Sequence, residues 1–385
     1  MHLFKKLISY SKKNLLAEIE TITAQRDNWA NKYSELSKKY KSLREKYQIQ
    51  VLKNKEQSQK IKDLSGKYKE QSKYKFFSGI SNRDGSFKKF FIENNMPAAI
   101  ANLKANLDSE SQKVIDDTIE KMLYIPDRKH RHFYRMDKEI AKEFLEFPYE
   151  KEADRICSES IESWKEKYVL QEGSYDLEVL YKHHGLSGIG QKIKDYIKNK
   201  DFIDGGAYVG DSALVFFEYE PKKVYSFEMS PKNSQNYYKT MNDNHIDFEK
   251  YEFVNLGISD GKYEFSINDT GENGASLTDS GNTLVHTTDI DSYVFENNLD
   301  VGFIKTDVEG AGLLALKGME KTIRKFRPVL SLAIYHTPEE FFETKPYLEN
   351  IVKDLNYKIR IEKHNSVFHT ISGVVLMAYP AELEV

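Results

Sequence analysis

The sequence has little cysteine and proline and no long apolar run. Its single cysteine, Cys157, excludes a disulfide framework and is typical of a reducing compartment. Because no stretch reaches about 18 apolar residues, we expect no membrane-spanning helix. The first residues lack the apolar core and small-residue cleavage site of a signal peptide, so we expect a cytoplasmic protein.

The net charge of −3 conceals an asymmetry along the 385 residues. Residues 1–75 hold 19 Lys/Arg and 8 Asp/Glu, a net of +11, whereas the rest holds 38 and 52, a net of −14. A basic arm can contact an anionic membrane or nucleic acid, or it can be an ordinary solvated helix. The acidic remainder is unfavourable for binding phosphate backbones, so we expect no nucleic-acid partner.

The basic arm divides into two segments. Residues 15–75 contain no proline and keep one seven-residue pattern of apolar positions, which predicts a coiled coil and therefore a homo-oligomer. A long helix packed on its own body is the alternative. Residues 1–14 alternate apolar pairs with lysines, an amphipathic basic pattern that leaves peripheral contact with the inner membrane face open.

The remaining sequence changes character near residue 171. Residues 76–170 have apolar residues at helical spacing and predict a helical domain. From 171 to 385, apolar strand-like runs alternate with helical runs, which predicts an α/β fold with a parallel sheet covered by helices on both faces. Residues 261–291 depart from the alternation and predict an inserted hairpin.

Residues 201–210, DFIDGGAYVG, form the most informative segment. A short apolar strand ends at Asp204, a glycine turn follows, and a helical run begins at Asp211. Glycines let backbone N–H groups approach a ligand closely, and a helix start carries partial positive charge, so the segment predicts a site for a small anionic or zwitterionic ligand. Ala207 occupies the second glycine position of a dinucleotide-binding turn, which argues against a dehydrogenase.

The ends of the other strands also carry polar residues. In open α/β sheets, ligands bind beyond the carboxyl ends of the strands, at the point where the strand order reverses. The second strand ends at Glu228, whose carboxylate can accept hydrogen bonds from both ribose hydroxyls. The third ends near Asn255 and Gly257. The fourth and fifth deliver Asp307 with Glu309, and Tyr335 with His336.

These segments together resemble the FkbM family of S-adenosylmethionine-dependent methyltransferases. The resemblance rests on five segments that occur in family order and cover about 181–345: YKHHGLSGIGQKIKDYIKNKDFIDGGAYVGDSA, VYSFEMSPKN, TTDIDSY, FIKTDVEGAG and PVLSLAIYHTPEEFFE. It implies a Rossmann-like class I fold with seven strands, the last antiparallel. It also implies S-adenosylmethionine as the cofactor and methylation of a hydroxyl oxygen, commonly on a sugar or a polyketide.

The resemblance also assigns roles to residues. It implies that Asp204, Gly206 and Gly210 hold the methionine end of the cofactor and that Glu228 holds the ribose. The full expected cofactor set is Asp204, Gly205, Gly206, Ala207, Gly210, Asp211, Glu228 and Gly257. For catalysis we expect Asp307, Glu309 and His336, with the histidine as the base that removes the hydroxyl proton.

Further expectations concern substrate contacts, a metal ion and departures from the family pattern. His183 and His184, just before the first strand, and Tyr335 are candidates for substrate contact, although either histidine can instead cap the preceding helix. Because the fifth strand ends in His336 rather than in an Asp/Asn pair, we expect no metal. Gly312 replaces an acid that is usual in the family, and the segment IRIEKHNSVFHTISG lacks the usual aromatic and arginine pattern.

The sequence thus predicts an O-methyltransferase that acts on a sugar or surface-glycan intermediate. The alternative is a coiled-coil scaffold or length-setting assembly protein whose methyltransferase fold has no catalytic role. A base N-methyltransferase is disfavoured because the turn after the fourth strand is Asp-Val-Glu-Gly instead of an Asn/Asp-Pro-Pro-aromatic turn.

Overall fold

The computed structural model describes residues 87, 90, 94–124, 148–171, 174–267, 283–364 and 372–384. The basic segment 1–14 and the coiled coil 15–75 lie outside the described residues, so they stay predictions. Residues 76–94 and 99–385 form one compact unit, and the elements that position the site all belong to it.

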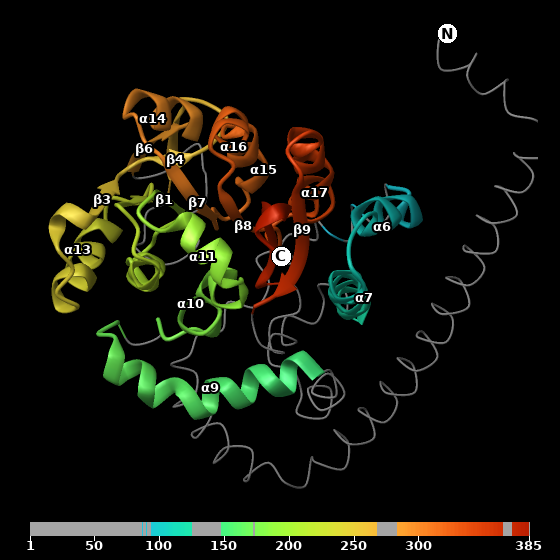
Figure 1. Ribbon diagram of the computed structural model, residues 1–385, viewed down its shortest axis with the longest axis horizontal. Coiled ribbons are helices and arrows are strands. Elements are labelled where there is room, and N and C mark those ends of the chain that lie inside the picture. The colour runs from blue at the N-terminus through green and yellow to red at the C-terminus, as the bar shows by residue number, and fades with distance from the viewer. Residues whose placement is uncertain are drawn as a thin grey trace, which may run out of the picture. The chain divides into compact units, whose positions relative to one another are not determined.

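A seven-stranded, mostly parallel sheet forms the centre of this unit (Figure 1). The strand order is β3-β2-β1-β7-β8-β10-β9, and β10 runs antiparallel to both of its neighbours. The predicted Rossmann-like α/β fold is therefore confirmed. The strands are β1 Asp201–Gly205, β2 Val224–Phe227, β3 Tyr251–Val254, β7 Val301–Thr306, β8 Val329–Ala333, β9 Tyr357–Lys363 and β10 Val374–Pro380.

The central strands of the sheet are buried on both faces. Every residue of β1, β2, β7 and β8 is buried, as expected for strands covered on both faces. Phe202 and Phe303 pair in register across β1 and β7. Their rings lie 5.2 Å apart and both pack against Phe216, so one aromatic cluster joins the sheet to the helix after the glycine turn.

Helices cover both faces of the sheet (Figure 1). The face that carries Phe202 and Phe303 shares one hydrophobic cluster with α10 Leu177–Leu180, α11 Gln191–Ile197, α12 Asp211–Phe216 and α13 Asn233–Asp243. Successive strand residues point to opposite faces, and Tyr225 packs against Tyr293 on the other face. The remaining helices of this part are α14 Ile290–Glu296, α15 Gly312–Lys317, α16 Glu320–Phe326 and α17 Pro338–Val352.

The described part of residues 76–170 is helical, with α6 Met96–Lys104, α7 Ser109–Tyr124 and α9 Pro148–Lys167. Helix α7 covers the edge strand β9, where the Ile361 N–H donates to Ser111 Oγ at 3.0 Å. Covering an edge strand prevents it from pairing with another chain. No described helix has the length and apolar character needed to cross a bilayer.

The predicted inserted hairpin is also present. Strands β5 Glu264–Ile267 and β6 Thr283–Thr288 pair antiparallel, and β6 pairs in turn with the short β4 Gly257–Ile258. Short 3₁₀ segments occupy Phe217–Tyr219, Phe248–Lys250, Ala381–Leu383 and, with a kink at His184 and Gly185, His183–Gly188. This small sheet follows β3 directly, so it flanks the carboxyl end of the main sheet.

Candidate active site

The strand order reverses beside β1, because the chain continues to β2 and β3 on one side and to β7 and β8 on the other. At such a reversal the connections leave in opposite directions and open a crevice beyond the carboxyl ends of the strands. The glycine turn, Glu228 and Asp307 directly follow β1, β2 and β7. The structure therefore brings the predicted strand-end residues to one edge.

The glycine turn lies directly against the turn after β7. A side chain at Gly206 would place its Cβ 1.9 Å from the carbonyl oxygen of Asp307, and the φ of Gly206 is +78°. The Asp307 N–H donates to the Gly205 carbonyl at 2.9 Å, and the Gly206 N–H donates to the Phe227 carbonyl at 2.9 Å. Glycine is required here by both conformation and space, and the turn is tied to β2 and β7.

Asp204 is fully buried and forms an ion pair with a lysine from β7. Lys305 Nζ lies 3.2 Å from Asp204 Oδ1 and donates to the Gly206 carbonyl at 2.9 Å. The two side chains are 4% and 0% exposed, so the pair is sealed from solvent. Burial lowers the pKa of Lys305, but Asp204, Asp307 and Asp211 outweigh burial and raise it. Asp204 thus holds Lys305 in place, and Lys305 in turn binds the glycine turn.

Glu228 connects the end of β2 to the glycine turn. One carboxylate oxygen accepts the Tyr208 N–H at 3.0 Å, and the other accepts the Ser230 N–H at 2.7 Å. Burial raises the pKa of Glu228, and these two N–H groups partly offset that effect. The Asn233 side chain also hydrogen-bonds this carboxylate, so the half-buried Glu228 keeps acceptor capacity for a further donor such as a ribose hydroxyl.

The end of β3 lies beside the loop that follows Glu228. Asn255 Nδ2 donates to the carbonyl oxygens of Glu228 and Met229 at 2.8 and 3.2 Å. Gly257 begins β4, where an added Cβ would lie 3.2 Å from Thr287 Cγ2 and 3.5 Å from Met229 Cβ. The backbone at Gly257 therefore lies close to the loop that follows Glu228.

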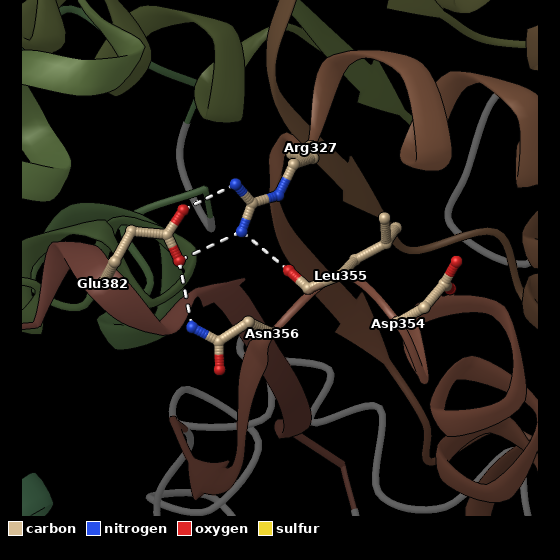
Figure 2. Close-up of a pocket in the computed structure, with 5 residues that line it drawn as sticks. All are labelled: Arg327, Asp354, Leu355, Asn356 and Glu382. Carbon is tan, nitrogen blue, oxygen red and sulfur yellow. Dashed lines mark hydrogen bonds and ion pairs between the residues drawn. The ribbon is translucent and has the colours of Figure 1, made fainter.

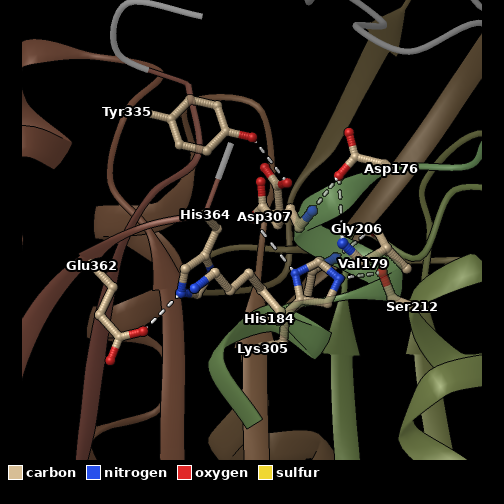
Figure 3. A network of polar contacts seen from close by, with 12 residues as sticks. Asp176, Val179, His184, Gly206, Ser212, Lys305, Asp307, Tyr335, Glu362 and His364 are labelled. Carbon is tan, nitrogen blue, oxygen red and sulfur yellow. Dashed lines mark hydrogen bonds and ion pairs between the residues drawn. The ribbon is translucent and has the colours of Figure 1, made fainter. Parts of the chain in front are cut away.

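The catalytic candidates converge on one buried histidine. His336 Nε2 lies 3.0 Å from Asp307 Oδ1 and 3.9 Å from Glu309 Oε2. The Tyr335 hydroxyl donates to Asp307 Oδ2 at 3.1 Å, and Figure 3 shows the two groups facing each other. Burial raises the pKa of Asp307, but His336 and Lys305 outweigh burial and hold it well below its ordinary value.

A second carboxylate binds the other side of this ring. Glu340, in the first turn of α17, lies with Oε2 3.2 Å from His336 Nδ1. Burial lowers the pKa of His336, but hydrogen bonds to Asp307 and Glu340 raise it well above its ordinary value. Glu309 lacks such close partners among the described residues, and burial raises its pKa although His336 partly offsets the effect. His336 thus faces three carboxylates, and those of Asp307 and Glu340 lie within hydrogen-bonding distance of its two ring nitrogens.

The two histidines before β1 have different partners. His183 Nδ1 lies 2.9 Å from the Tyr219 hydroxyl, and burial lowers its pKa to about 4. His184 is buried, and its Nε2 lies 2.8 Å from Ser212 Oγ in the first turn of α12 (Figure 3). Among the predicted substrate residues, the structure thus places His184 beside the glycine turn, whereas His183 contacts Tyr219.

Helix α10 adds acids near His184. Asp176 caps the helix by accepting the Glu178 N–H at 2.7 Å, and burial raises its pKa to about 6. Burial likewise raises the pKa of Asp211, with Lys305 as the main opposing influence. Glu178 is buried and lies 3.6 Å from His184 Nδ1. The predicted residue Asp211 thus belongs to an acidic group on this flank.

Strand β9 runs parallel to β8, so its carboxyl end reaches the same edge. There His364 Nε2 lies 2.9 Å from Glu362 Oε2 (Figure 3). His364 is fully buried, and its contact holds the pKa of Glu362 below the ordinary value although burial opposes the shift. Glu362 and His364 lie in the segment IRIEKHNSVFHTISG, which lacks the aromatic and arginine pattern usual in the FkbM family.

Two buried residues of the site, Lys305 and Glu340, were not predicted. Lys305 interrupts the apolar run VGFIKT, and a lysine inside a central strand indicates a buried charge with a partner. Glu340 stands three residues after Thr337, the spacing of a capping box. Thr337 Oγ1 does accept the Glu340 N–H at 3.1 Å, but the Glu340 carboxylate binds His336 instead of the Thr337 N–H.

Among the described residues, no group of three or more His, Cys, Asp or Glu side chains is arranged to hold a metal ion. A pocket of about 340 Å³ lies elsewhere and is lined by Arg327, Asp354, Leu355, Asn356 and Glu382 (Figure 2). Arg327 precedes β8, so this pocket lies at the amino edge of the sheet. Arg327 contacts both oxygens of Glu382, at 2.5 and 3.0 Å, which makes the pocket a structural junction.

Comparison with known proteins agrees with this arrangement. Residues 204–359 match the model of the methyltransferase FkbM domain. The chain carries an FkbM methyltransferase domain. The match begins at Asp204 and ends in β9, so it includes the glycine turn, Glu228, the Asp-Val-Glu-Gly turn and His336.

Solved structures of other methyltransferases are similar to parts of this chain. The methyltransferase FkbM from Methylobacillus flagellatus KT has a TM-score of 0.50 and 17% identity, covering 77% of this chain and 61% of that one. The chain thus spans about three fifths of that protein's length. A putative methyltransferase from Streptococcus mutans in complex with SAH has a TM-score of 0.31 and 13% identity over 51% of this chain and 96% of that one. No curated protein matches significantly.

Proposed function

We propose that this protein is an S-adenosylmethionine-dependent O-methyltransferase that methylates a hydroxyl of a sugar or surface-glycan intermediate. The observation that carries the proposal is the convergence, at the reversal of strand order, of the glycine turn, Glu228 and the Asp307–Glu309 turn. The backbone contact between Gly206 and Asp307 places the cofactor-binding candidates and the catalytic candidates side by side.

The residues present fit S-adenosylmethionine. The absence of a side chain at Gly206 lets the glycine turn lie directly against the turn after β7, and the half-buried Glu228 carboxylate can accept a hydroxyl hydrogen at the end of β2. The acidic surroundings from Asp176, Asp211 and Glu309 suit a ligand with a sulfonium and an ammonium group. When bound, the cofactor supplies a methyl group on a good leaving group.

The protein has to orient the acceptor and remove its proton. Most of the rate enhancement then comes from alignment, because a sulfonium needs little further activation. An alcohol loses its proton as the new bond forms, so a carboxylate or a histidine must lie at the crevice. Asp307, Glu309 and His336 supply these groups. The partly exposed carboxylate of Glu362 at the carboxyl end of β9 can accept a hydroxyl hydrogen, which suits a hydroxylated acceptor.

Methyl transfer from radiolabelled S-adenosylmethionine tests this proposal. The full-length protein is incubated with sugar and glycan acceptors from its own cell extract, and NMR of the product locates the methyl group on oxygen. Asp307→Asn serves as the inactive control. Label on oxygen of a saccharide, absent with the variant, supports the proposal. Label on nitrogen, or cofactor binding without any transfer to any acceptor, contradicts it and favours the scaffold alternative.

The N-terminal predictions extend the proposal. We propose that residues 15–75 assemble the protein into a homo-oligomer and that residues 1–14 bring it to the inner membrane face. Co-sedimentation with anionic vesicles tests the second part. Loss of sedimentation on deletion of residues 1–14 supports it, and undiminished sedimentation contradicts it.

A further inference from the structure

Glu340 has an unusual concentration of N–H contacts around one buried carboxylate. It is 1% exposed. Its Oε1 accepts the Gly312 N–H at 2.7 Å, and its Oε2 accepts the His336 backbone N–H at 3.1 Å and lies 3.2 Å from His336 Nδ1. Three donors fix both oxygens, so the carboxylate cannot rotate away from the ring.

The neighbouring backbone is shaped to admit this carboxylate. A Cβ at Gly312 would lie 2.8 Å from Glu340 Oε1, which is too close for any side chain without a shift. Gly312 begins α15, and Glu340 lies in the first turn of α17, a helix of 15 residues. Glycine at position 312 therefore allows the Glu340 carboxylate to reach the Gly312 N–H.

The contacts of His336 on both sides decide its protonation. A neutral imidazole donates from one nitrogen only, whereas an imidazolium donates from both. Here Nδ1 faces Glu340 and Nε2 faces Asp307 at 3.0 Å, and both partners are acceptors. Glu309 adds a third carboxylate at 3.9 Å. A ring that donates from both nitrogens has no lone pair left for the proton of an acceptor hydroxyl.

The charged and titratable groups that surround this ring come from several elements. Asp307 and Glu309 face it from the turn after β7, Glu340 faces it from α17, and the Tyr335 ring lies beside it at 4.1 Å. Lys305, Glu228 and His184 act on these carboxylates. The set contains more carboxylates than cations, which favours the charged ring.

The carboxylates of Asp307 and Glu309 differ in how tightly other side chains hold them. Asp307 is held by His336 on one oxygen and by the Tyr335 hydroxyl on the other. Glu309 has a φ of +50°, rare for a residue with a side chain, and its side chain is 31% exposed. Its 3.9 Å separation from His336 is longer than a hydrogen bond. Unusual backbone conformations of this kind occur at functional sites.

We propose that Glu340 is a positioning residue that holds His336 as an imidazolium, and that Glu309 accepts the proton of the acceptor hydroxyl. This inference rests on the proposed function and replaces the histidine as the base. The hydroxyl oxygen forms its bond to the methyl carbon while the carbon–sulfur bond breaks and its electron pair stays on sulfur. The hydroxyl proton passes to the Glu309 carboxylate and later to solvent, and His336 stays protonated throughout.

NMR of the full-length protein with ¹⁵N-labelled histidine tests the first part without any substrate. The His336→Gln variant assigns the signal. At about pH 8, where an ordinary histidine is neutral, we expect both ring nitrogens of His336 to carry protons. A neutral ring in the unsubstituted protein at that pH overturns the inference.

The Glu340→Gln variant tests the positioning role, with Glu339→Gln as a matched control because Glu339 is the exposed neighbour on the same turn. Losing one carboxylate should lower the titration midpoint of His336 by about 1–3 pH units. The alkaline limb of the pH–rate profile should move down by the same amount. The control should change neither, and an unmoved His336 midpoint in Glu340→Gln contradicts the positioning role. If Glu340→Gln does not fold, Glu340→Asp takes its place, because its shorter side chain draws the carboxylate away from His336 Nδ1 and should lower the midpoint in the same direction.

The Glu309→Gln variant tests the base. We expect kcat to fall by about 10²–10⁴-fold, with cofactor affinity unchanged, because general-base catalysis contributes that much. Full activity of this variant overturns the assignment of Glu309. If no acceptor is methylated by the unsubstituted protein, the proposed function fails, whereas the NMR result on His336 still decides the role of Glu340.

Discussion

The buried pair between Asp204 and Lys305 offers the sharpest test of how the site is built. The change is Lys305→Met, which keeps the length of the aliphatic chain and removes the charge. The pair joins β1 to β7, and the lysine also donates to the Gly206 carbonyl at 2.9 Å. The substitution therefore leaves the Asp204 carboxylate and one carbonyl of the glycine turn without their cation.

The expected cost follows from distance and burial. At 3.2 Å and an effective dielectric constant of about 20, the Coulomb attraction is about 5 kcal/mol. Removing one partner of a buried pair usually costs about 3–5 kcal/mol because the other charge stays buried. Both side chains are at most 4% exposed, so solvent cannot replace the lost partner. We expect the free energy of unfolding to fall by about 3–5 kcal/mol.

Urea denaturation followed by far-ultraviolet circular dichroism measures this loss. Lys198→Met is the matched control, because its ion pair with Glu220 at 2.7 Å is exposed and should contribute at most about 1 kcal/mol. In the double variant Asp204→Asn/Lys305→Met, the loss of unfolding free energy should be clearly smaller than the sum of the losses in the two single variants. A loss under about 1 kcal/mol for Lys305→Met, or strict additivity in the double variant, would refute a structural role for the pair.

The remaining predictions are as follows. Gly206→Ala should weaken S-adenosylmethionine binding more than tenfold in calorimetry, because its Cβ would lie 1.9 Å from the Asp307 carbonyl; unchanged affinity would place the cofactor elsewhere. The pKa of His336 is raised in the folded state, so its ion pairs stabilise the fold fully below about pH 6.5 and lose this effect as the pH rises through the raised value. The urea midpoint should therefore fall toward alkaline pH more steeply than in His336→Gln, and an opposite slope would contradict the charged ring. Deletion of residues 1–75 should lower the oligomer mass in light scattering, and an unaltered mass would reject the coiled coil.

Sequence patterns were sufficient for the fold and for the edge of the sheet at which the strand-end residues meet. The apolar runs that predicted strands become the central parallel strands, because a strand buried on both faces has little polar sequence. The residues after them, such as Glu228 and Asp307, meet at one edge because the carboxyl ends of parallel strands lie together. The inserted hairpin was predictable because its alternating sequence interrupts the strand–helix alternation.

The partners of buried charges were not predictable. Lys305 and Asp204 are about a hundred residues apart, and their contact depends on β7 lying beside β1. The spacing of Thr337 and Glu340 indicated a capping box, yet the carboxylate binds the ring and backbone of His336. The predicted role of His336 as the base came from the ordinary pKa of histidine. Its charge depends on carboxylates from the turn after β7 and from α17, which only the tertiary structure brings together.

Calorimetric titration of the full-length protein with S-adenosylmethionine measures whether the residues at the ends of β1 and β2 bind the cofactor. Glu228→Gln is compared with Glu249→Gln, an exposed glutamate outside the crevice. We expect saturable binding of one cofactor per chain and its displacement by S-adenosylhomocysteine. The affinity should be at least about tenfold weaker in Glu228→Gln, because a charged hydrogen-bond acceptor is lost. The affinity of Glu249→Gln should be normal. Absence of binding to the folded protein, or equal affinity in both variants, would contradict cofactor binding at these strand ends.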